Sequence, residues 1–96
     1  MQYDIYRLAG DVLVVDLQSD LIDIGTRVVA PLVLKTARPV PLPTLEPMVL
    51  FNGHPHLMLV SEMTAISARH LGPAIGDLRR EEYMIRRAVD MVFTGI

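Results

Sequence analysis

The stretch "MVLFNGHPHLMLV" (Met48–Val60) carries the clearest local signal for the fold. Two apolar runs flank the dipeptide Asn52–Gly53, and these residue types tolerate the positive φ angles that a two-residue type I′ turn requires. The stretch therefore predicts a tight β-hairpin at the middle of the chain.

A second hairpin is predicted at the start of the chain. Gln2–Leu8 alternates polar and apolar residues, which predicts a strand with one solvated face, the face of Asp4 and Tyr6. Val12–Leu17 is apolar and β-branched, which favours a more central strand. The residues between them, Ala9–Asp11, have turn chemistry, so the two strands are expected to pair.

The segments around the central hairpin complete a mainly antiparallel β-protein. A polar loop, Gln18–Gly25, precedes a third strand, Thr26–Leu34. Pro31 lacks a backbone donor, which predicts an edge or bulge position inside that strand. The proline-rich segment Ala37–Pro47 is expected to be an extended surface loop, and "EMTAIS" (Glu62–Ser67) a short strand.

The last segment changes to a helical period. Asp77 is a candidate N-cap, the helix is expected to run to about Phe93, and Gly95 is its natural stop. One face would pack on the sheet and a second apolar stripe would face another partner. The first face comprises Leu78, Ile85, Val89 and Val92, and the second stripe comprises Met84, Ala88 and Met91.

Length and composition bound the class of protein. The 96 residues predict a single domain over 1–96, yet 51% of them are hydrophobic. A domain of this size buries little more than one core, so the excess predicts a homodimer. Cysteine is absent, the net charge is −2, and no secretory signal or membrane span is visible. We expect a cytoplasmic protein that binds neither membranes nor nucleic acid directly.

The search for catalytic or metal-binding chemistry finds only weak candidates. His54 and His56 could bind zinc only with a third ligand such as Glu62. A phosphate-binding glycine loop and a serine nucleophile motif are both missing. Acidic turn residues and mixed-charge helix residues are expected to be solvated: Asp16, Asp20, Asp23, Arg79, Arg80, Arg86 and Arg87. We therefore predict no catalytic residue, no metal and no cofactor.

Three collinear stretches resemble the CcdB family of toxins. They are "MQYDIY" (1–6), "VDLQSDLID" (15–23) followed by "GTRVVAPL" (25–32), and "DLRREEYMIRRAVDMVFTGI" (77–96), which ends in Gly-Ile. "EPMV" and "SEMTAI" are also similar to the family. The resemblance implies a small SH3-like barrel of antiparallel strands with a C-terminal helix. It also implies a homodimer whose C-terminal helices lie near the twofold axis.

The function that the resemblance implies is non-enzymatic. The family poisons DNA gyrase by binding its A subunit and holding the enzyme on cleaved DNA. A cognate antitoxin, with a disordered C-terminal segment that folds along the toxin, would neutralise it. Carried over by position, the gyrase-binding residues would be Leu21, Ile22, Asp23, Glu82, Tyr83, Arg86, Arg87, Asp90, Phe93, Thr94, Gly95 and Ile96.

Three positions depart from the family pattern, one of them seriously. Thr94 stands where well-known members have the tryptophan that anchors gyrase, and Tyr83 and Asp90 replace neutral amides. Two alternatives therefore stay open. The chain could be a CcdB-like dimer that has lost or changed its target, or an mRNA endonuclease of the MazF type. The second would need a catalytic arginine, for which Arg27 is a possible start.

Overall fold

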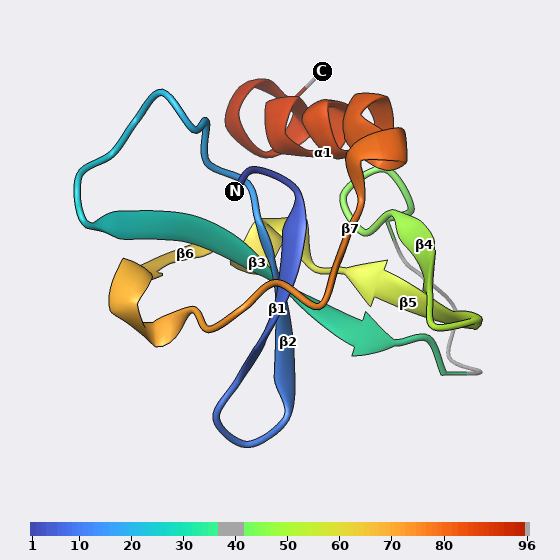
Figure 1. Ribbon diagram of the computed structural model, residues 1–96. Helices are drawn as coiled ribbons and strands as arrows, with labels where there is room; N and C mark the ends of the chain where they lie inside the picture. The colour runs from blue at the N-terminus through green and yellow to red at the C-terminus, as the bar shows by residue number, and fades with distance from the viewer. Residues whose placement is uncertain (37–41, 96) are drawn as a thin grey trace.

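The computed structural model describes residues 1–36 and 42–95, and in these residues one antiparallel sheet curls into a nearly closed barrel (Figure 1). The sheet order is β4-β5-β3-β2-β1-β7, with β6 also paired to β3. A helix, α1, follows the last strand. The expected fold class, a mainly β SH3-like barrel with a C-terminal helix, is confirmed. The strands are β1 Asp4–Leu8, β2 Val12–Asp16, β3 Thr26–Leu34, β4 Met48–Phe51, β5 His54–Met58, β6 Thr64–Ser67 and β7 Gly76–Asp77; the helices are the 3-10 turns η1 Val60–Glu62, η2 Ala68–His70 and η3 Arg79–Glu81, and α1 Glu82–Thr94.

The central hairpin forms as its sequence predicts. Phe51 pairs directly with His54, which leaves Asn52 and Gly53 as the two turn residues. Their φ angles are 53° and 76°, as a type I′ turn requires. The turn therefore fixes the register of β4 on β5.

The third strand is a central strand, which corrects the expectation for Pro31. β3 pairs with β2 on one side and with β5 and β6 on the other. β6 pairs with the first part of β3, up to Val29, and β5 with the last part, from Leu32. Pro31 lies between these two parts, where its carbonyl accepts a bond from the Leu59 amide at 2.8 Å. The missing donor is tolerated because the partner strand changes at that point.

The barrel has two apolar clusters, one on each face of the sheet. Tyr6 was expected on a solvated face but is 7% exposed, because the segment that includes Ile66 and Leu71 covers it together with Val14 and Val29. The larger cluster fills the barrel and meets the helix; it comprises Tyr3, Ile5, Val15, Ala30, Leu32, Val49, Met58, Val60, Leu78, Ile85 and Ala88.

The helix begins later than its sequence suggests. Asp77 accepts a hydrogen bond from the Arg79 amide at 3.0 Å, just before the short turn η3, and α1 starts only at Glu82. The expected stop is confirmed. Gly95 has a φ of 76°, and its amide donates to the Met91 carbonyl at 3.0 Å.

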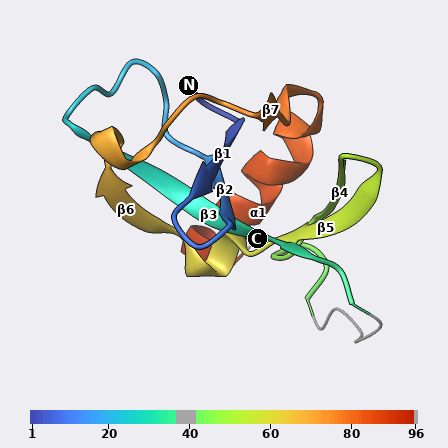
Figure 2. The same ribbon diagram turned by 60° about the horizontal axis from the view of Figure 1, so that its bottom comes forward.

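The two expected helix stripes do not face different partners. Ile85 and Ala88, one from each stripe, are both buried, and Met84 and Val89 pack beside them. Val92 is 37% exposed. A single face of α1 thus lies across the barrel, and the turned view shows the helix behind the strands (Figure 2).

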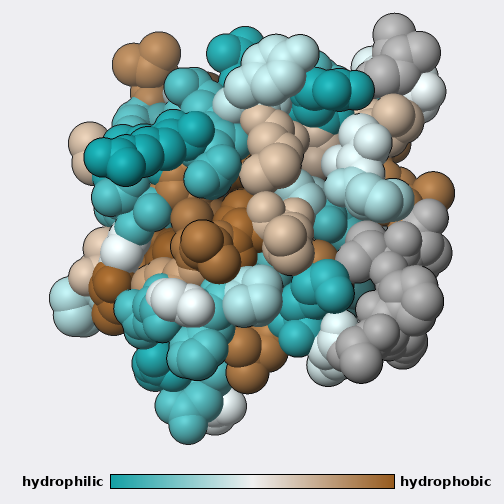
Figure 3. Space-filling model, turned by 90° about the vertical axis from the view of Figure 1, so that its right-hand side faces the viewer, coloured by the Kyte–Doolittle hydropathy of each residue, from teal (hydrophilic) through white to brown (hydrophobic). Residues whose placement is uncertain are grey.

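Apolar residues also remain exposed away from the helix. On the side of the molecule that carries β4 and β5, apolar side chains gather near the centre of the view and polar ones surround them (Figure 3). On β4, Met48 is 53% and Leu50 is 70% exposed. No helix in the described part of the chain is long and apolar enough to cross a membrane.

Candidate protein-interaction site

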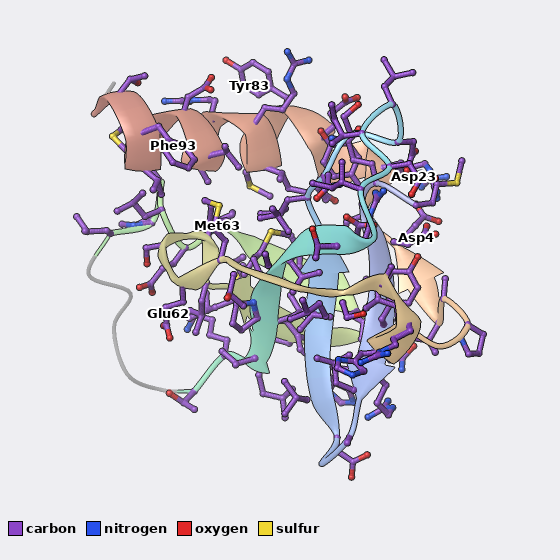
Figure 4. The ribbon with its side chains drawn as sticks, turned by 90° about the vertical axis from the view of Figure 1, so that its left-hand side faces the viewer. Asp4, Asp23, Glu62, Met63, Tyr83 and Phe93 are labelled. Carbon is purple, nitrogen blue, oxygen red and sulfur yellow. The ribbon has the colours of Figure 1, made fainter. Side chains whose placement is uncertain are left out.

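The outer side of α1 presents an aromatic ring among charged groups. Tyr83 is 76% exposed and points away from the sheet (Figure 4). The guanidinium of Arg87 lies 6.0 Å from the centre of its ring, a cation–π contact. Arg86 forms an ion pair with Glu82 at 4.0 Å. Because Tyr83, Arg86 and Arg87 are all exposed, this surface is available to a partner.

The end of the helix is apolar and short of polar anchors. Phe93 is 72% exposed. The Thr94 hydroxyl donates to the Asp90 carbonyl at 2.7 Å, so its only polar group is used within the helix. Gly95 turns the chain out of the helix with its positive φ. Ile96 lies outside the described residues.

The loop between β2 and β3 is the second exposed apolar element. Leu21 is 93%, Ile22 is 48% and Ile24 is 71% exposed, and Asp23 is also exposed. Apolar side chains this exposed on a short loop are typical of a surface that binds another protein. The sequence resemblance named Leu21, Ile22 and Asp23 but not Ile24.

A groove separates this loop from the helix. It has a volume of about 350 Å³. The Tyr3 hydroxyl lies in it, 3.5 Å from a carboxylate oxygen of Glu82. Burial, and then the nearby Glu82 charge, raises the pKa of Tyr3 above its usual value. The groove is lined by Gln2, Tyr3, Leu17, Ser19, Glu82, Ile85, Arg86, Val89 and Asp90.

The predicted residues share one side of the molecule without forming a compact cavity. In the view of Figure 4, Asp23 lies toward one end of this side, Phe93 toward the other, and Tyr83 between them. Glu82, Arg86 and Asp90 line the groove, whereas the exposed tip of the loop does not. The arrangement suits an extended protein contact better than a small ligand.

The acidic cluster differs from its expected solvated form. Asp16 is fully buried, and the Nε and a terminal nitrogen of Arg27 contact its Oδ2 at 2.9 and 2.8 Å. The same arginine also reaches Asp20 at 3.2 Å. Burial alone would lower the pKa of Arg27, but the bonds to both carboxylates raise it overall. Sequence reasoning missed this pair because nothing local shows that Asp16 is buried.

The His54–His56 pair, considered above as a zinc site, makes structural contacts in the hairpin. His56 is 5% exposed, its Nδ1 lies 2.8 Å from the His54 carbonyl, and its ring packs edge-on against Phe51. In the part of the chain that the structure describes, no three histidine, aspartate or glutamate residues come close enough to hold a metal ion.

The fold and its exposed surface define a small barrel protein with a C-terminal helix and a broad side of exposed apolar and charged residues. The chain belongs to the CcdB family, since the family model described as "CcdB protein" matches residues 2–95. Membership of this family supports a toxin of a toxin–antitoxin module.

Two solved structures share the fold. The first, "Crystal structure of Mtb toxin", has a TM-score of 0.73 at 19% identity and covers 93% of this chain and 99% of its own. The second, "Mycobacterium tuberculosis toxin MazF-mt6", has a TM-score of 0.71 at 22% identity, with coverages of 97% and 96%. At these identities the similarity establishes the barrel and helix alone.

Proposed function

We propose that this CcdB-family protein is the toxin of a type II toxin–antitoxin module, which binds the A subunit of DNA gyrase and traps the cleaved gyrase–DNA complex. The carrying observation is the extended exposed side with Leu21 on the loop and Tyr83 and Phe93 on the helix. Large apolar and aromatic groups surrounded by charges are the usual anchors of a protein–protein interface. Such a protein acts by binding and needs no catalytic group.

The state of Arg27 supports binding over RNA cleavage. A catalytic arginine must turn its charge toward a phosphate in the transition state. Here the guanidinium is neutralised by the buried Asp16 and shared with Asp20. The hollow beside it also contains Asp23, which adds a third carboxylate where an RNA backbone would have to approach. We therefore rank a MazF-like endonuclease below a gyrase poison.

A homodimer is part of the proposal. Val92 is 37% exposed near the end of α1 in the single chain, and we expect a second copy to cover it and leave Phe93 to the target. A twofold dimer would present two helix ends side by side to a twofold target. A cognate antitoxin with a disordered segment would bind across the same side and block it.

Thr94 supports a second candidate, a CcdB-like dimer that has lost or changed its target. Its side chain is small and its hydroxyl is bonded to the Asp90 carbonyl at 2.7 Å. It therefore offers neither a ring nor a free polar group to gyrase. A change of target would keep the fold, the dimer and antitoxin binding.

The experiment is a gyrase cleavage assay with the purified protein, gyrase and supercoiled DNA. We expect cleaved DNA to accumulate with wild-type protein and with Leu50→Ala, a control at a 70% exposed residue on β4, outside the loop and helix of the proposed contact. Phe93→Ala should abolish most of it. No trapped complex at high protein concentration would reject gyrase poisoning and favour a lost or changed target.

The same purified protein also tests the alternative that the chain is an mRNA endonuclease. Incubation with a long single-stranded RNA should leave the RNA intact. RNA cleavage that is lost in Arg27→Ala, with the protein still folded by circular dichroism, would revive the endonuclease.

A further inference from the structure

The half-buried side chain of Gln18 makes two hydrogen bonds that join the β2–β3 loop to the sheet. Its Oε1 accepts a hydrogen bond from the Val28 amide at 3.0 Å, and its Nε2 donates to the Ile22 carbonyl at 2.7 Å. Val28 lies on β3 and Ile22 lies near the tip of the loop. One side chain therefore ties the tip to the sheet.

The backbone of Gln18 is hydrogen-bonded to both members of the buried ion pair, Asp16 and Arg27. Its amide donates to Oδ1 of Asp16 at 3.0 Å, and its carbonyl accepts from Arg27 at 2.9 Å. Asp16 is fully buried, so it provides a fixed point for the start of the loop. Charge-assisted bonds of this kind are stronger than neutral ones.

Apart from the Gln18 bond, the tip from Leu21 to Ile24 is held by local bonds: the Ile22 amide donates to the Ser19 carbonyl at 3.0 Å, and the Leu21 amide to the Ser19 hydroxyl at 3.2 Å. The residue before the tip, Asp20, is bonded from outside the loop by the Gln2 amide at 2.9 Å and by Arg27 at 3.2 Å. Leu21 is 93% and Ile24 is 71% exposed, so their side chains bury almost nothing that would order the loop. The order of the tip must come from its backbone bonds.

We propose that Gln18, fixed by Asp16 and Arg27, is a positioning residue that pre-forms the loop so that Leu21 meets the protein target in its bound conformation. This inference rests on the proposed function, in which the loop contacts gyrase. A pre-formed loop avoids the entropy cost of ordering on binding. In this proposal Arg27 has a structural role, because it bonds the Gln18 carbonyl.

A double-mutant cycle on gyrase A binding tests whether Gln18 acts through Leu21. We expect Gln18→Ala to weaken binding about 10-fold in the wild-type background and less than about 2-fold when Leu21→Ala is already present, as coupled residues do. Gln18→Glu keeps the acceptor for the Val28 amide but loses the donor to Ile22, so it should not rescue binding. Arg7→Ala is the control, because Arg7 pairs only with Asp11, at 3.6 Å, beside the β1–β2 turn and lines neither the loop nor the groove.

Hydrogen exchange of the free protein gives a readout that a general loss of stability would not reproduce. In Gln18→Ala the Leu21 and Ile22 amides should exchange at least about 10-fold faster, whereas the β3 amides that bond β2 should not. Faster exchange confined to the tip supports the inference, and unchanged exchange at Ile22 overturns it.

The outcomes separate this inference from the proposed function. If Leu21→Ala weakens gyrase binding and Gln18→Ala does not, or if the two effects add fully, only the positioning role is overturned. If Leu21→Ala leaves binding unchanged, the proposed loop contact fails, and the positioning role fails with it.

Discussion

Replacing Thr94 by tryptophan should restore the missing anchor at the end of α1. Thr94 is an exposed residue of the last helical turn, so a larger side chain meets no core. The only bond lost is that from its hydroxyl to the Asp90 carbonyl. Such back-bonding does not stabilise a helix, and threonine and tryptophan have similar helix propensities. The folded protein should therefore tolerate Thr94→Trp.

The expected gain follows from the area that a tryptophan can bury. A ring that buries about 200 Å² at about 25 cal/mol per Å² contributes about 5 kcal/mol before the ordering cost. Truncation of an interface anchor residue typically costs at least about 2 kcal/mol of binding free energy. We expect Thr94→Trp to bind the gyrase A subunit about 30-fold more tightly, since each tenfold change equals about 1.4 kcal/mol.

Titration calorimetry with purified gyrase A subunit measures this change. Thr94→Val is the matched control, because it removes the hydroxyl without adding a ring, and its affinity should stay within about 2-fold of wild type. The reasoning is refuted if Thr94→Trp folds with an unchanged melting temperature and binds gyrase no more tightly than wild type.

Three further predictions test the fold that carries the site. Ile85 is 1% exposed, so Ile85→Ala should lower the free energy of unfolding in urea by about 2–5 kcal/mol; a change near zero would contradict its place in the core. Gly95 has a φ of 76° with no atom within 4 Å of an added Cβ, so Gly95→Ala should cost about 1 kcal/mol from the left-handed backbone alone, a fall in melting temperature of about 4–8 °C. Burial and then neighbouring carboxylates raise the pKa of Tyr3 and Tyr6 above 10.0. Because the folded state favours the protonated phenols, this stability is present below pH 10 and is lost as the pH rises through the raised values; tyrosinate absorbance that shows both titrating at or below pH 10 would be inconsistent with their burial.

Local signals in the sequence predicted the parts of the fold that depend on local backbone geometry. Asn52 and Gly53 specify their turn because both adopt positive φ angles. Gly95 specifies the helix end for the same reason. The resemblance to the CcdB family implied the barrel. The structure confirms the barrel, and the family model confirms the resemblance.

Features that depend on distant partners could not be predicted from one sequence. Pro31 lies at the point along β3 where the partner strand changes from β6 to β5. Tyr6 is buried by a segment some sixty residues later in the chain, which includes Ile66. Alternation within a strand cannot reveal what covers its second face.

The candidate site was predicted only in outline. The described helix and loop residues lie on one side, and their role in binding stays a prediction. The buried Asp16 and its bonds to Arg27 and Gln18 were missed. A buried carboxylate is recognisable only when its partner is known. Arg27 was considered as a start for catalysis, yet its contacts are those of a structural ion pair.

The central claim is that the exposed helix and loop bind the gyrase A subunit without catalysis. The most direct measurement is calorimetric titration of gyrase A with wild-type protein and with Phe93→Ala, a residue that is 72% exposed in the single chain. The account predicts saturable binding by wild type and a loss of at least about 10-fold in affinity for Phe93→Ala. Absence of wild-type binding, or binding that Phe93→Ala leaves unchanged, would contradict it.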